Sequence, residues 1–164
     1  MRYVLNTFSY TIDYLHDQVS DVNAEDMVRQ PSGMINHPAW TIGHLAASCE
    51  AIGGEIGLAP WLPEHWTRSF GTGSRPLGLR ESYPAREELM AVLGDAALRV
   101  TTRVQEMPPE LLDRELPDER YRSILPTIAH AVTQILVAHS AHHIGQVAVW
   151  RRLVDLPPLE RPFL

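Results

Sequence analysis

The octapeptide from His139 to Gln146, HSAHHIGQ, sets two histidines, His139 and His143, four residues apart within a long apolar segment. In a helix, residues i and i+4 lie one above the other on the same face, so both imidazoles can reach one metal ion. A third histidine, His44, lies in a second helix-like segment, WTIGHL. Three neutral nitrogen ligands that leave a coordination position open are typical of a catalytic rather than a structural metal site.

Hydrogen-bonded core histidines are the alternative to a metal site. His139 and His143 share a helical stripe that otherwise holds apolar residues, so both point into the expected core. A buried imidazole without a partner costs about 1–3 kcal/mol. The i, i+4 pair alone fits two hydrogen-bonded core histidines better than it fits a metal site. Because His44 lies on another apolar helix, the metal site becomes the favoured interpretation.

The residues around the pair are expected to have other roles. His142 is about 100° from His143 around the helix, which places it beside the site or on the surface rather than on the same ion. Gln146 follows His143 by about one turn, so it can hydrogen-bond a ligating histidine or a metal-bound water, or else another helix. Surface positions are expected for the remaining histidines, which are His16, His37, His65 and His130.

Three further residues bear on the chemistry. Cys49 is expected to be a small buried apolar side chain rather than a nucleophile. Glu50, six residues after His44, does not share its helix face closely and is expected to be a surface charge. Gly145 is expected to permit close helix packing beside the site. None of the three supplies a protein nucleophile paired with a histidine.

Helical periodicity predicts four helices and an all-α fold. Apolar residues recur at steps of three and four, and no sustained alternation indicates a strand. Asn36 is the expected cap of the second helix, with Pro38 in its first turn, and Ser82 is the expected cap of the third. We predict a four-helix bundle that forms one domain over residues 1–164. The helices are expected at about residues 2–20, 38–56, 84–106, and from Ser123 or Pro126 to about Val154.

Two connections interrupt the helices. Residues 57–82 are rich in proline and glycine, and a connection of this length is unusual in a compact domain unless it crosses the bundle or shapes a site. It would allow the second and third helices to run in the same direction. Residues 107–124 form a second connection, with a short turn expected at Pro109–Asp113.

Composition argues against several classes of partner. The net charge is −6, and the 14 basic residues are scattered rather than gathered in a stripe, which argues against binding to nucleic acid. The single cysteine, Cys49, allows no internal disulfide and favours a reducing, cytoplasmic location. The N-terminus lacks the pattern of a signal peptide, and no run of about 18 apolar residues indicates a membrane span.

The segments NHPAWTIGHL (36–45) and HSAHHIGQ (139–146) resemble the DinB-like, YfiT-like family of bacterial metalloproteins. The resemblance implies a four-helix bundle with up-down-down-up topology. It also implies a divalent metal held by His44, His139 and His143. Many members of that family carry a basic residue where this chain has Ile144, so no anion-steering role is expected at this position.

The same resemblance implies a class of activity. Characterised relatives include metal-dependent transferases and isomerases that use bacillithiol, mycothiol or glutathione. A thiol S-transferase with a small-molecule substrate is therefore the favoured function, since a metal can bind a thiol as thiolate. A metal-dependent hydrolase comes second, and a non-catalytic metal- or ligand-binding bundle third; a homodimer is compatible with each. Zn or Ni is favoured and Fe or Mn are alternatives, because three imidazoles do not select one metal.

Overall fold

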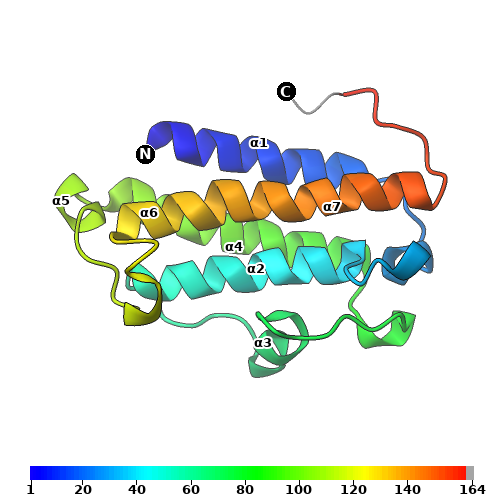
Figure 1. Cartoon of the computed structure of the whole chain (residues 1–164), viewed down its shortest axis with the longest axis horizontal. Coiled ribbons are helices and arrows are strands. Elements are labelled where there is room, and N and C mark those ends of the chain that lie inside the picture. The colour runs from blue at the N-terminus through cyan, green and yellow to red at the C-terminus, as the bar shows by residue number, and fades with distance from the viewer. Residues whose placement is uncertain (162–164) are drawn as a thin grey trace.

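Four long helical rods lie side by side in the computed structural model, which describes residues 1–161 (Figure 1). Three rods are single helices: α1 (Arg2–Val19), α2 (Pro38–Glu55) and α4 (Arg86–Glu106). The fourth is continuous and consists of α6 (Ile128–Thr133), the π-helical turn η5 (Gln134–His139) and α7 (Ser140–Leu153). Shorter helices occupy the connections: η1 (Asp26–Val28), η2 (Pro31–Gly33), α3 (Glu64–Phe70), η3 (Arg80–Ser82), α5 (Pro109–Leu112) and η4 (Glu119–Tyr121).

The prediction of an all-α fold is confirmed. Within residues 1–161 the structure contains no strand, and a single antiparallel bridge pairs Glu115 with Thr127. Each of the four predicted helices is present, with ends that differ from the expected ones by a few residues. No helix in this part of the chain is long and apolar enough to cross a membrane.

The directions of the rods explain the long connection between α2 and α4. In Figure 1, α1 and the fourth rod run from left to right, whereas α2 and α4 run from right to left. Because α2 and α4 are parallel and packed against each other, the chain must return along the bundle between them. Residues 56–85 make this return. The expected loop is in fact partly helical, since it contains α3 and η3.

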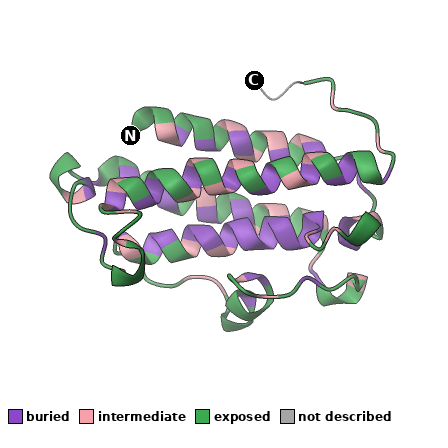
Figure 2. Cartoon of the chain, viewed as in Figure 1, coloured by how far each residue is buried: buried purple, intermediate pink, exposed green. Residues whose placement is uncertain are grey.

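The core forms where apolar residues recur at helical spacing. The predicted stripe of the third helix is fully buried: Leu89, Leu93, Ala96, Val100 and Val104 are each at most 2% exposed. In α2 almost every residue from Pro38 to Cys49 is buried, as its colour in Figure 2 shows. A helix that is apolar on all sides must be covered on all sides. Here α3 packs on the side of α2 that the other rods leave open.

Two predicted helix caps are wrong. The cap of α2 is His37 rather than Asn36: its Nδ1 accepts a hydrogen bond from the Trp40 N–H at 3.2 Å. Its Nε2 then carries the proton and donates to the Leu77 carbonyl at 3.0 Å. His37 is therefore buried, contrary to the expected surface position, because both ring nitrogens are satisfied by backbone. In α4 the cap is Ala85, without a side-chain bond, and Ser82 ends η3 instead.

Glu50 also departs from its expected role. Its Oε1 accepts hydrogen bonds from the backbone N–H groups of Trp61 at 2.7 Å and Leu62 at 2.6 Å. Nearby, a Cβ on Gly53 would overlap the indole of Trp61. The carboxylate and the glycine thus fix the start of the return segment against the end of α2.

We expect the substitution His37→Asn to weaken the pH dependence of stability. Burial lowers the pKa of His37 from 6.5 to about 4, against the smaller effect of its hydrogen bonds to backbone. Between these values the unfolded chain binds a proton that the native protein does not, so stability falls as the pH falls. Asparagine retains a capping acceptor and does not titrate. From about pH 7 to pH 4.5 the wild type should lose about 2 kcal/mol more than the variant in urea unfolding. An equal loss in the two proteins would contradict a neutral, buried His37.

Candidate metal centre

The three histidines singled out by their spacing converge on one point. Nε2 of His139 lies 3.2 Å from Nε2 of His44 and 3.2 Å from Nε2 of His143. All three ligand atoms lie within 4.8 Å of one another. His44 comes from α2, His139 ends η5 and His143 is in the first turn of α7. His44 and His143 are buried and His139 is half-buried.

Hydrogen bonds at the outer nitrogens determine which tautomers are present. Nδ1 of His44 lies 2.7 Å from the Phe70 carbonyl, which can only accept, so Nδ1 carries the proton and Nε2 is bare. Nδ1 of His143 lies 3.2 Å from Oε1 of Gln146, and it likewise donates. Two bare nitrogens thus face the same point, and the third, on His139, can donate to only one of them.

Burial keeps the three imidazoles uncharged at neutral pH. Desolvation, helped by repulsion from the neighbouring imidazoles, lowers the pKa of His139 to about 4 and that of His143 to about 3. Desolvation also lowers the pKa of His44, partly opposed by the hydrogen bond to Phe70. Histidine must be neutral to ligate, so the cluster is ready for a cation without first losing a proton.

The geometry fits a divalent metal ion. A tetrahedral zinc site with Zn–N bonds of about 2.0–2.1 Å places its nitrogens about 3.3 Å apart, close to the two observed separations. Facing lone pairs repel each other in a dry core unless a cation lies between them. Nδ1 of His139 is buried and has no hydrogen-bond partner in the described part of the chain. With Nε2 bound to a metal, the proton of this neutral imidazole would lie on Nδ1, for which residues 1–161 supply no acceptor.

The position of His44 depends on the glycine before it. A Cβ on Gly43 would overlap the ring of Phe70, so the glycine allows α3 to approach α2 closely. The Gly43 carbonyl also accepts a hydrogen bond from Nε1 of Trp66 at 3.0 Å. This approach brings the Phe70 carbonyl to Nδ1 of His44. On the other side, the ring of Trp40 stacks on the imidazole with centroids 4.5 Å apart and planes at 10°.

Gln146 links the cluster to a second polar residue that the sequence did not single out for this role. Its Oε1 accepts from Nδ1 of His143 and from Nδ2 of Asn36, the latter at 2.9 Å. Its Nε2 donates to Nε2 of His142 at 3.0 Å. Asn36, expected to cap α2, instead holds the amide that orients His143. His142 is exposed and lies outside the converging group, as its angle on the helix predicted.

The π-helical turn before the site was not predicted. The sequence indicated an uninterrupted α-helix, but η5 adds a wider turn that ends at His139. The Ser140 hydroxyl donates to the carbonyl of Ile135 at 3.0 Å within this wider turn. Single π-helical turns inside α-helices are frequently found at functional sites. No residue type in the segment QILVAH marks the change of hydrogen-bond pattern.

The other chemically interesting residues lie away from the cluster. Cys49 is buried, as expected, and burial raises the pKa of its thiol to about 12. His16, His65 and His130 are exposed, again as expected. Gly145 does not serve close packing, since a Cβ there would meet no atom of residues 1–161 within 4 Å.

A family model described as the DinB superfamily matches residues 7–147, a span that includes all three converging histidines. The chain belongs to the DinB superfamily. A crystal structure of a conserved protein from Enterococcus faecalis has a TM-score of 0.76 against it, at 18% identity over 94% of this chain and 96% of that one. At this identity the likeness shows a shared fold. No curated protein matches the sequence.

We expect Gly43→Ala to weaken metal binding in this DinB-superfamily protein. The added methyl displaces the Phe70 ring and with it the carbonyl that orients His44. Overpacking should cost about 1–3 kcal/mol in unfolding experiments, and loss of the outer hydrogen bond should reduce metal affinity about 10–100-fold.

Gly54→Ala is the matched control for this variant. Gly54 lies on the same helix, and a Cβ there meets no atom within 4 Å among the residues that the structure describes. Alanine at this position should raise stability by up to about 1 kcal/mol and leave metal affinity unchanged. If the two variants bound metal equally well, Phe70 would have no part in positioning His44.

Proposed function

We propose that His44, His139 and His143 bind a divalent metal ion and that the protein is a metal-dependent enzyme acting on a small molecule. The observation that carries the proposal is the convergence of three imidazole Nε2 atoms, two of them fixed as bare acceptors by their outer hydrogen bonds. Zn or Ni is the preferred ion. Fe or Mn are alternatives, because imidazole ligands suit several metals and do not select one.

The charge of the ligand set favours an anionic reactant. The converging group consists of three neutral histidines and includes no carboxylate among the described residues. A divalent ion held there keeps its full charge, so a negatively charged group is attracted to any open coordination position. When bound, the metal supplies Lewis-acid chemistry that lowers the pKa of a thiol or of water near it.

Thiol S-transfer is the favoured reaction because characterised relatives of this family use low-molecular-weight thiols, and because this reaction takes its nucleophile from outside the protein. Cys49, the single cysteine, is buried, and its raised pKa keeps it protonated at neutral pH. The chain's own residues are suited to position reactants. Trp40 covers one face of His44, and the polar side chains of Asn36 and Gln146 lie beside His143.

Hydrolysis is the second candidate and uses the same site, with water in place of the thiol. A non-catalytic bundle that binds a metal or a ligand is the third. The two enzymatic functions differ in the nucleophile, whereas the third predicts metal binding without turnover.

Replacement of the converging histidines should abolish metal binding. We expect about one equivalent of metal per chain in wild-type protein purified without a tag. We expect less than about one tenth of that in His139→Ala and His143→Ala, because each variant leaves only two ligands. His142→Ala is the matched control: it is adjacent to His143, exposed and outside the converging group, and it should retain the metal. Elemental analysis provides the measurement. A wild type that remains metal-free in metal-replete medium would refute the site.

Metal-loaded protein should accelerate thiol addition to a model electrophile. We expect turnover of 1-chloro-2,4-dinitrobenzene with glutathione or another low-molecular-weight thiol. His143→Ala should lose more than about 100-fold in rate, beyond the usual cost of an outer hydrogen bond. Gly54→Ala should match the wild type. Hydrolysis of 4-nitrophenyl acetate that is faster than thiol addition to 1-chloro-2,4-dinitrobenzene would favour the hydrolase. Metal binding without turnover of either compound would favour the non-catalytic bundle.

A further inference from the structure

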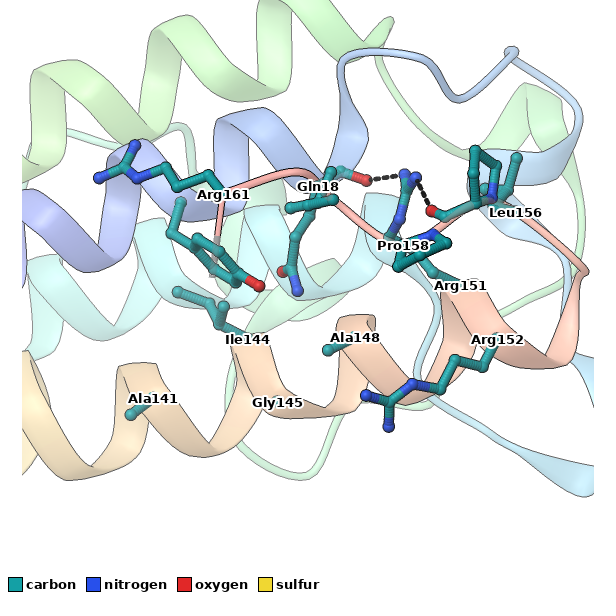
Figure 3. Close-up of a pocket in the computed structure, with 13 residues that line it drawn as sticks. Gln18, Ala141, Ile144, Gly145, Ala148, Arg151, Arg152, Leu156, Pro158 and Arg161 are labelled. Carbon is teal, nitrogen blue, oxygen red and sulfur yellow. Dashed lines mark hydrogen bonds between the residues drawn. The ribbon is translucent and has the colours of Figure 1, made fainter. Parts of the chain in front are cut away.

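A cavity of about 460 Å³ lies on the side of α7 that faces away from the histidines. It is bounded by α1, by α7 and by the segment after α7 (Figure 3). On α7 its wall includes Ala141, Gly145 and Ala148, which lie about 180° around the helix from His139 and His143. The cavity is therefore separate from the candidate metal centre.

Small residues leave the cavity open on the α7 side. A Cβ on Gly145 would meet nothing within 4 Å in the described part of the chain, although glycine within a helix costs about 1 kcal/mol relative to alanine. The opposite wall is apolar and proline-rich, formed by residues 156–159. Ile144 is buried and lines this cavity. An apolar body thus fits the interior.

One buried polar side chain lacks a partner in this cavity. Gln18 of α1 is 1% exposed and lines the cavity, and its Oε1 accepts no hydrogen bond among the residues that the structure describes. In Figure 3 its side chain extends from α1 toward α7, and the amide ends between Ile144 and Ala148. A buried amide oxygen without a donor costs about 1–3 kcal/mol. A bound molecule with a hydrogen-bond donor would therefore stabilise this side chain.

The charges at the cavity are all positive. Arg151, Arg152 and Arg161 line it, and no acidic residue of the described chain does. Arg151 is bound to both carboxylate oxygens of Asp21, and Arg161 is paired with Asp17. Arg152 is exposed and makes no side-chain hydrogen bond or ion pair within residues 1–161. In a protein with a net charge of −6, this unpaired cation beside an apolar cavity is suited to an anionic group.

We propose that this cavity binds a small carboxylic acid with an apolar or aromatic body and a hydroxyl group. The hydroxyl donates to Oε1 of Gln18, the body lies against the small residues of α7, and the carboxylate pairs with Arg152. Apolar lining with a few placed polar groups is typical of small-molecule sites. The site does not depend on the metal or on the proposed enzymatic function.

Titration calorimetry with 3-(4-hydroxyphenyl)propionate tests the proposal on the full chain. We expect saturable binding of one equivalent, with a dissociation constant below about 1 mM, in both metal-loaded and chelator-treated protein. 3-Phenylpropionate should bind about tenfold more weakly, because Gln18 is left without a donor. Tyramine, which replaces the carboxylate with an amine, should not bind. Absence of binding by the first compound, or equal affinity for the first two, would overturn the proposal.

Substitutions test whether the acid binds in this cavity. Gly145→Leu should fill the cavity and abolish binding. Gly94→Leu is its matched control, because it also places a side chain in open space on an exposed helical surface, outside the cavity. Gln18→Leu should erase the difference between the phenol and the phenyl compound, and Arg152→Gln should weaken both equally.

Circular dichroism would verify that each variant is folded. If Gly145→Leu bound the acid as the wild type does, the cavity would not be the site. Sedimentation that showed Gly145→Leu converting a dimer into a monomer would assign this face to a second copy of the chain and also overturn the proposal.

Discussion

The hydrogen bond from Nδ1 of His44 to the Phe70 carbonyl couples the candidate metal centre to the long connection of the bundle. Because α2 and α4 run in the same direction, a return segment between them is unavoidable, and this protein uses it to build the site. The close approach of Phe70 requires glycine at position 43, and Nε1 of Trp66 secures the same turn of α2. A topological necessity thereby supplies the acceptor that fixes the tautomer of a ligating residue.

The fold and the central residues of the site follow from patterns that are local in sequence. Steps of three and four define the helices, and an i, i+4 pair of histidines inside an apolar stripe has few stable explanations. The contributions of Asn36, Phe70 and His37 could not be predicted, because each depends on a partner about 26 to 110 residues away. Glu50 is a similar case. Its carboxylate accepts hydrogen bonds from backbone N–H groups of the return segment, and this contact exists only once that segment lies beside α2.

α7 is shared between two environments that face opposite directions. One side carries His143 and Gln146, and the other carries the small residues that bound the cavity beside α1. Each helical turn offers three or four side chains, which is enough to supply both sides. The backbone needs none of them, because a helix satisfies its own polar groups. The segment HSAHHIGQ therefore encodes more than its histidines: Ala141, Ile144 and Gly145 in the same stretch belong to the opposite side.

The π-helical turn η5 has a consequence for how the site can be gained or lost in evolution. A π turn accommodates one more residue than the α-helical turn that it replaces, so a single inserted codon can create it. A single deleted codon within η5 would restore the regular helix and rotate His139 and His143 together by about 100° relative to α6, away from His44. The same rotation would turn the apolar stripe of α7 relative to that of α6, although both now face one core. The three-histidine site and the packing of the fourth rod are therefore gained or lost together.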